Sequence, residues 1–163
     1  MNFPKEIDPA HILSMADLEV SVALASPLVT FDQERQITAA LAEKWEIIPP
    51  KTIQFKLRKD LVWSDGTPVL AEHFRLSLER AKHSYPNDLK ALFDAIESIS
   101  ATDATTLRIT TSTDVQKSGI LLKLTEPMYG LLSVKNGKID LSKTSGPFLI
   151  SKQTDNEVVL KAN

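Results

Sequence analysis

Residues 57–81, LRKDLVWSDGTPVLAEHFRLSLERA, pass from an alternating stretch through a tight acidic turn into an amphipathic stretch. Asp65 can accept backbone N–H bonds, Gly66 supplies unusual φ angles, and Pro68 presets φ for the next bend. Such a turn redirects the chain sharply from a strand into a helix. We therefore interpret residues 65–68, called the corner below, as an architectural feature rather than a reactive centre.

The residues that flank the corner predict a hairpin before it and a helix after it. Residues 44–48 and 52–58 are separated by a short loop, and the second stretch alternates with a period of two, which is typical of a half-buried hairpin. Residues 71–84 carry an apolar stripe at helical spacing. The side chains expected to face the core are Ile53, Phe55 and Leu57 in the strand and Phe74, Leu78 and Ala81 in the helix, with Trp63 packing against Phe74 or in a shared core.

The rest of the chain predicts further hairpins and short helices. Ser14 and Asp17 can cap a helix that Pro27 would end, and residues 89–93 and 115–124 are expected to be helical. Residues 32–35 resemble a turn, and residues 37–41 are expected to form a brief helical or irregular link. Strands are expected at 28–31, 95–103, 105–112, 129–135, 138–142, 146–151 and 157–162, with Asn136-Gly137 as a hairpin turn. The sum predicts a mixed α+β fold.

Composition narrows the class of protein. The chain has 163 residues, 42% hydrophobic and 25% charged, which is enough for one domain or for a slice of a larger one. Its net charge of -2 and pI near 5.9 argue against a nucleic-acid binder. The lack of cysteine excludes disulfides and thiol chemistry. No apolar run approaches the roughly 20 residues of a membrane span, and the first residues lack the pattern of a signal peptide.

No motif for catalysis or for a cofactor is apparent. The five glycines form no phosphate-binding loop, and no serine-nucleophile pattern is present. Glu79 and His83 lie one helical turn apart and could form half of a zinc site, but no second pair of ligands accompanies them. We therefore interpret that pair as a solvated surface contact, and we expect no metal, no cofactor and no enzymatic activity.

Several blocks resemble one protein family. The stretches ALAEKWEI, FKLRKDLVWSDGTPVLAEHFRLSLERA and SGPFLI…VVLKAN, with IDPAH near the start, resemble the extracytoplasmic solute-binding proteins of peptide and nickel ABC transporters, family 5. The resemblance implies a two-lobed periplasmic protein that closes on a peptide or similar small solute and delivers it to a membrane permease. This chain would be a periplasmic-binding-protein-like lobe fragment: residues 1–43 start lobe I, residues 44–143 form an inserted accessory subdomain, and residues 144–163 form the return hairpin. The hinge and lobe II would be absent.

The resemblance also suggests where the solute lies. Family members place ligand contacts in the loop after the D-P-A element, which here is residues 12–16 with Leu13, Ser14 and Met15 as the candidate contacts. That loop is apolar with one hydroxyl, which indicates an uncharged or apolar ligand surface; alternatively, Leu13 and Met15 pack under the following helix. Ser26 and Pro27 stand where the family has Y-E-G-L, so they are candidate contacts whose specificity does not carry over.

Two further departures from the family pattern concern structure. The family has a threonine and an acidic residue as a capping box after D-G-T-P, where this chain has Leu70 and His73, so part of the helix cap should be lost. The family's G-T-G-P-Y is TSGPF at residues 144–148, which keeps the turn.

Other interpretations stay open at this point. The same fold could be the solute-sensing domain of a bacterial transcription regulator, which an upstream helix-turn-helix would indicate, and peptide hydrolysis would indicate an enzyme. In the transport interpretation the protein is extracytoplasmic and tethered through its transporter or a lipid anchor outside this chain. A one-sided lobe should bind solute weakly, and its uncovered apolar surface could drive self-association.

Overall fold

The computed structural model describes residues 7–9, 14–84, 91–154 and 157–163. Its helices are α1 (Met15–Leu24), α2 (Ala71–Ser84), α3 (Ala91–Asp94), α4 (Val115–Ser118), α5 (Ile120–Lys123) and the 3-10 helix η3 (Pro127–Tyr129). Its strands are β1 (Val29–Phe31), β2 (Ile37–Ala39), β3 (Ala42–Ile48), β4 (Thr52–Leu57), β5 (Ile96–Asp103), β6 (Thr106–Thr111), β7 (Leu132–Lys135), β8 (Lys138–Thr144), β9 (Phe148–Thr154) and β10 (Glu157–Ala162). The mixed α+β prediction is confirmed.

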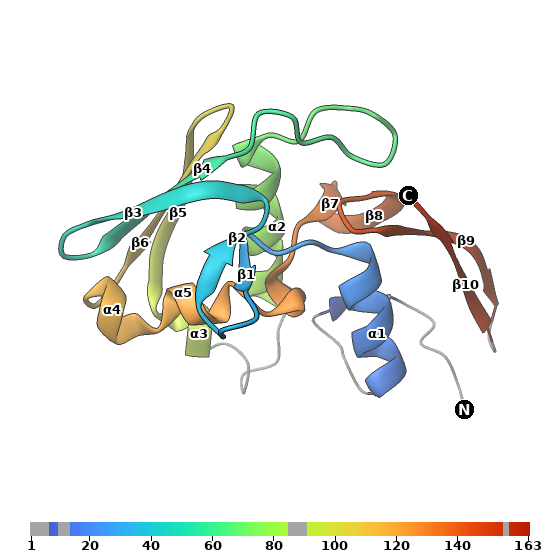
Figure 1. The fold of residues 1–163 in the computed structure, drawn as a ribbon, viewed down its shortest axis with the longest axis horizontal. Helices are drawn as coiled ribbons and strands as arrows, with labels where there is room; N and C mark the ends of the chain where they lie inside the picture. The colour runs from blue at the N-terminus through green and yellow to red at the C-terminus, as the bar shows by residue number, and fades with distance from the viewer. Residues whose placement is uncertain (1–6, 10–13, 85–90, 155–156) are drawn as a thin grey trace.

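A four-stranded antiparallel sheet forms one side of the molecule, on the left of Figure 1, in the order β3-β4-β6-β5. The alternation that predicted a half-buried strand is seen in β4, where Ile53, Phe55 and Leu57 are fully buried. Phe55 lies opposite Leu107 of β6, and Ile53 lies opposite Ile109. The inner face of the sheet is therefore a continuous apolar surface across its two central strands.

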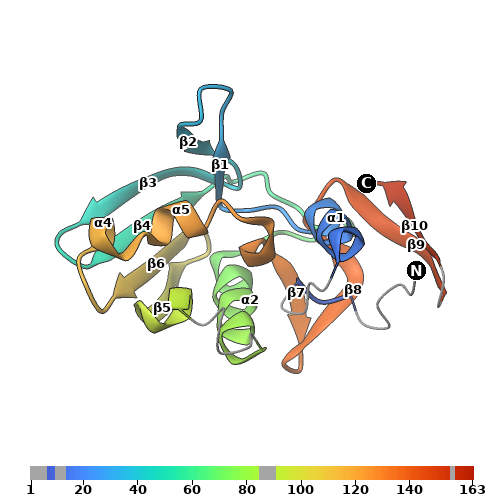
Figure 2. The ribbon, with the colours of Figure 1, turned by 90° about the horizontal axis from the view of Figure 1, so that it is seen from below.

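Helix α2 covers this apolar surface with the stripe expected from the sequence. Phe74, Leu78 and Ala81 are buried, and the helix contacts β5 and β6 on one side and β7 on the other. Figures 1 and 2 both show α2 between the four-stranded sheet and the β7–β8 hairpin. Trp63 is 1% exposed and belongs to the same cluster as Phe74, so the expected shared core is confirmed.

A second, smaller apolar cluster lies where α1 meets the last hairpins. Ile7, Val20 and Leu24 are buried in it. Its other members are only partly buried: Leu141 of β8, Ile150 of β9, and Val158 and Leu160 of β10. This cluster is much less enclosed than the one beneath the four-stranded sheet. No helix among the described residues is long and apolar enough to cross a membrane.

Residues 37–41 differ from the prediction, because Ile37–Ala39 is strand β2, paired antiparallel with β1. The polar turn that precedes it has the geometry of a hairpin. The Asp32 carboxylate accepts the backbone N–H of Glu34 at 2.9 Å and that of Gln36 at 2.8 Å, and Arg35 has φ of 60°. This side-chain capping reverses the chain, so the prediction of a helical or irregular link was wrong. In Figure 2 this hairpin projects from the body of the molecule.

Residues 115–124 form two short helices rather than one. Asp114 caps α4 by accepting the N–H of Gln116, and Gly119 has φ of 64°, which ends α4 before α5 begins. The glycine thus interrupts the stretch that was expected to be helical throughout.

The Asn136-Gly137 hairpin is confirmed, with φ of 53° and 74° at the two positions.

The end of α1 and the start of β9 touch through backbone atoms at Gly146. Its N–H donates to the carbonyl of Leu24 at 3.0 Å. A Cβ atom on residue 146 would lie 2.4 Å from the carbonyl oxygen of Ala23 and 2.6 Å from the carbonyl carbon of Leu24. Because both neighbours are backbone atoms that cannot rotate away, only glycine allows this approach.

Gly146→Ala should therefore destabilise the protein by about 3 kcal/mol, since the two segments must separate and lose their hydrogen bond. The measurement is urea unfolding followed by circular dichroism. Gly66→Ala is the matched control: its Cβ would meet no atom within 4 Å but its φ of 81° is unfavourable, so about 1 kcal/mol should be lost. Equal losses for the two variants would contradict the steric explanation.

Candidate functional site

The corner is held by the side chain of its own aspartate. The Asp65 carboxylate accepts the backbone N–H of Thr67 at 2.9 Å and the Thr67 hydroxyl at 2.6 Å. Gly66 has φ of 81°, and the N–H of Trp63 donates to the carbonyl of Thr67 at 2.8 Å. These bonds close a tight loop between the last residues of an extended segment and the start of α2.

The residue before the corner is joined to strand β8, which lies far away in the sequence. The N–H of Ser64 donates to the carbonyl of Thr144 at 3.1 Å, and the N–H of Thr144 donates to the Ser64 hydroxyl at 3.0 Å. Next to this pair, the Lys143 ammonium lies 3.8 Å from the Asp65 carboxylate and 5.2 Å from the centre of the Trp63 ring. Strand β8 therefore holds the residue that precedes the corner through two hydrogen bonds and pairs with the charge of Asp65.

Asp65 has the electrostatics of a turn residue. The hydrogen bonds donated by Thr67 lower its pKa, and the Lys143 ammonium lowers it further. A carboxylate stabilised in its charged form is a poor proton donor near neutral pH. These contacts support the interpretation of the corner as an architectural feature.

The first turn of α2 is capped by a histidine rather than by an acidic residue. His73 Nδ1 accepts the backbone N–H of Leu70 at 3.0 Å and the indole N–H of Trp63 at 3.3 Å. The first of these bonds is the one that Glu or Gln makes in a capping box. Because Nδ1 accepts hydrogen bonds, the proton of the neutral ring lies on Nε2. The structure thus retains half of the capping box that the sequence comparison suggested was lost.

Leu70→Thr should supply the missing half, because a hydroxyl at this position can accept an unpaired N–H of the first turn. We expect about 1 kcal/mol of added stability and a higher melting temperature. Leu70→Val is the matched control, since it has the shape of threonine without the hydroxyl. If the valine variant is stabilised as much as the threonine variant, the cap is not the cause.

Stability should fall in mild acid because of His73. Burial lowers the pKa of His73 in the folded protein, and Lys143 lowers it further, so the unfolded chain binds the proton at a higher pH. The stabilisation is therefore complete above the ordinary value near 6.5 and decreases as the pH falls toward the folded pKa, by at most about 1.4 kcal/mol per pH unit. Urea unfolding at a series of pH values should show a flatter profile for His73→Gln, whose carbonyl can accept but not titrate; parallel profiles would disprove this role.

The predicted solute contacts at the start of α1 are only partly within the described residues. Ser14 is exposed and caps α1 by accepting the N–H of Asp17 at 3.2 Å, as the sequence predicted. Met15 is 71% exposed, so in this chain it does not pack under the helix. Leu13 lies outside the described residues. The exposed Met15 side chain is available to a ligand, and its role as a contact stays a prediction.

Ser26 and Pro27 lie at a crossing of chain segments. The N–H of Ser26 donates to the Ser145 hydroxyl at 3.0 Å, its own hydroxyl donates to the Ser145 carbonyl at 3.0 Å, and its carbonyl accepts the N–H of Leu131 at 2.9 Å. Pro27 accepts the N–H of Leu41 through its carbonyl. The N–H and the hydroxyl hydrogen of Ser26 are both engaged, so Ser26 can offer a solute acceptor groups but no donor. The two residues stay predicted contacts.

Ser145 was not singled out by the sequence, although it joins three segments. Besides its bonds to Ser26, its hydroxyl donates to the carbonyl of Leu131 at 2.7 Å. A single serine in a turn carries no local pattern that indicates such contacts. The signal available was the resemblance of residues 144–148 to a family turn, which did not show its partners.

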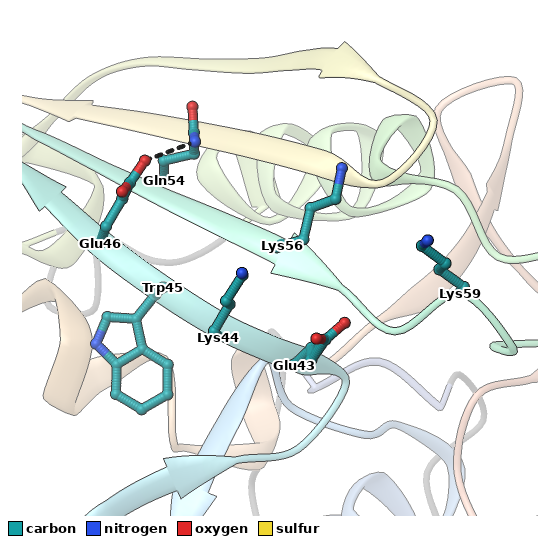
Figure 3. Close-up of a pocket in the computed structure, with 7 residues that line it drawn as sticks. All are labelled: Glu43, Lys44, Trp45, Glu46, Gln54, Lys56 and Lys59. Carbon is teal, nitrogen blue, oxygen red and sulfur yellow. Dashed lines mark hydrogen bonds between the residues drawn. The ribbon is translucent and has the colours of Figure 1, made fainter.

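A pocket of about 510 Å³ lies on the outer face of the four-stranded sheet (Figure 3), away from the predicted contacts. Its lining residues are Glu43, Lys44, Trp45, Glu46, Gln54, Lys56 and Lys59. The Gln54 side chain on β4 links charged side chains of the two neighbouring strands. Its amide nitrogen donates to the Glu46 carboxylate of β3 at 2.9 Å, and its amide oxygen accepts from the Arg108 guanidinium of β6 at 2.6 Å. Lys56 pairs with Asp103 at 3.6 Å. The lining carries charges of both signs, which is typical of a solvated sheet face.

The Glu79–His83 pair shows no metal-site geometry. The Glu79 carboxylate accepts from the Arg75 guanidinium on the same helix. Within the part of the chain that the structure describes, no three histidine, aspartate or glutamate side chains are grouped so as to hold a metal ion.

Comparison with known proteins identifies the family. Residues 36–163 match the family described as bacterial extracellular solute-binding proteins, family 5 Middle. Among curated proteins, the chain is 39% identical over 79 residues to the probable deoxycholate-binding periplasmic protein YgiS of Escherichia coli K12, a match covering 48% of this chain and 15% of that protein. It is 38% identical over 78 residues to the periplasmic oligopeptide-binding protein OppA of Haemophilus influenzae, covering 47% and 14%.

A solved structure extends the likeness to nearly the whole chain. The structure of MoaA from A. tumefaciens R10, in complex with mannopinic acid, superimposes with a TM-score of 0.81 at 28% identity, covering 96% of this chain and 34% of MoaA. The chain thus spans about a third of the length of that protein. Because the family match extends over most of its residues, the chain belongs to the bacterial extracellular solute-binding proteins of family 5.

Proposed function

We propose that these residues belong to the extracytoplasmic solute-binding component of an ABC importer, which carries a peptide or similar small solute to a membrane permease. The family match over residues 36–163 is the observation that carries this proposal. The similarity to an oligopeptide-binding protein supports a peptide as the solute. The similarity to a probable deoxycholate-binding protein is the reason why the proposal also includes other small solutes. The alternative of a solute-sensing regulator finds no support among these relatives.

The proposal includes a division of the chain. Residues 1–43 begin lobe I, residues 44–143 are an accessory subdomain and residues 144–163 return into lobe I. Two observations support it. Most of β3 and all of β4, β5 and β6 lie within residues 44–143 and form one four-stranded sheet, whose enclosed core also takes in Leu28 and Val29. The cluster around α1 and the last hairpins is only partly enclosed. Further chain would cover the second cluster and complete the lobe.

The surroundings of Met15 support a solute surface at the start of α1. The side chain is apolar and 71% exposed, beside the exposed hydroxyl of Ser14. A large apolar side chain in this position contributes nothing to the core of this chain, whereas contact with a solute would bury it. The names of its periplasmic relatives support an extracytoplasmic location. The proposal adds that the protein is held near its permease through the transporter or a lipid anchor.

The direct test is native mass spectrometry of the full natural chain, purified without denaturation. The expected result is one bound solute per protein, released on unfolding and replaceable by tri- to pentaalanine. A co-purified solute that is not a peptide would keep the importer role and replace the peptide assignment. If neither a co-purified molecule nor any of the peptides binds, the proposed function fails.

Met15→Glu should weaken solute binding without changing stability, since the new carboxylate would need desolvation on contact. We expect at least a tenfold rise in the dissociation constant, about 1.4 kcal/mol, with a melting temperature close to that of the wild type. Leu122→Glu is the matched control, because Leu122 of α5 is an apolar residue that is 53% exposed and lies outside the proposed contacts. Equal binding by both variants would remove Met15 from the site.

A further inference from the structure

One ion pair joins the first described residues to α2. The Arg80 guanidinium donates to both carboxylate oxygens of Asp8, with an Nη1–Oδ1 distance of 2.8 Å. The partners are 72 residues apart in the sequence. Their side chains are only 12% and 3% exposed, so the pair is shielded from water on nearly all sides. Such a two-point contact fixes orientation as well as distance, because the guanidinium and carboxylate planes must align.

The residue next to this pair connects it to α1. Ile7 is buried in the smaller apolar cluster with Val20 and Leu24 of α1. Asp8 binds α2 while its neighbour Ile7 packs on α1, so the short segment 7–9 forms a bridge between the two helices. The connection runs from Arg80 through Asp8 and Ile7 to the buried face of α1.

A second arginine on α2 shows that this contact differs from an ordinary helix-surface pair. Arg75 binds Glu72 and Glu79, both on the same helix and both more than two-fifths exposed. Among the described residues, the hydrogen bonds of that network stay within α2. Arg80 instead pairs with Asp8, which is remote in the sequence. The site is largely buried, so leaving either charge unpaired there would be unfavourable.

We infer that Asp8 and Arg80 are positioning residues for the solute surface: by fixing segment 7–9 on α2, they hold α1 with Ser14 and Met15 presented to the solute. The inference rests on the proposed function. It explains why the aspartate of the IDPAH element is buried and paired, although Ser14 and Met15 at the start of α1 are exposed. Neither Asp8 nor Arg80 needs to touch the solute in this role.

The test uses hydrogen–deuterium exchange on the full natural chain, which requires no solute. Asp8→Asn and Arg80→Gln should each speed exchange in α1 at least tenfold while leaving β4 and β6 unchanged. Arg75→Gln is the matched control and should leave α1 unchanged. If the first two variants do not fold, Arg80→Lys, which keeps the charge and loses the two-point contact, replaces them. Unchanged exchange in α1, or an equal rise throughout the protein, would overturn the inference.

A second measurement separates positioning from simple stabilisation. Isothermal titration with trialanine should show a dissociation constant raised at least tenfold by Asp8→Asn and Arg80→Gln and changed less than twofold by Arg75→Gln. Unchanged affinity despite faster exchange in α1 would overturn the positioning role. If the wild-type protein binds none of the peptides from tri- to pentaalanine, the peptide assignment fails, and the exchange result alone decides whether the bridge positions α1.

Discussion

The architecture depends on the contact between the corner and β8. A turn of four residues is too small to fix the direction of both segments that leave it, so its orientation must be set from outside. The reciprocal Ser64–Thr144 hydrogen bonds provide this, and Lys143 adds its charge opposite Asp65 and its ammonium above Trp63. Because Trp63 is buried in the main cluster, the same contact ties β8 to the core beneath the four-stranded sheet.

Local features of the fold could be predicted from the sequence because their causes lie within a few residues. The corner is made by Asp65 and Gly66, the Asn136-Gly137 hairpin by two positive φ angles, and the start of α1 by the Ser14 hydroxyl. The prediction for residues 37–41 was wrong, although its cause is also local. Asp32 closes the β1–β2 turn through two backbone bonds, and this was the missed indication of a strand at Ile37–Ala39.

The candidate site was less predictable, because its contacts join residues remote in sequence. Nothing in IDPAH indicates that Asp8 binds Arg80, or in TSGPF that Ser145 binds Ser26. Composition and periodicity describe which residues become buried but not which distant polar groups meet. The prediction of solute contacts at Ser14 and Met15 therefore came from the resemblance to the family. The contact between Asp8 and Arg80, which we infer positions this region, could be found only in the structure.

The crossing at Ser145 and Gly146 has a consequence for the order of folding. Ser26 and Ser145 are separated by 119 residues, whereas the strands of β3–β4 and β7–β8 pair across short turns. Closing a long loop costs more chain entropy than closing a hairpin, so contacts between remote segments form slowly. The hairpins and the sheet can assemble while these two segments are still apart. The junction then closes late, so α1 docks only after the segment around Ser145 and Gly146 has been synthesised.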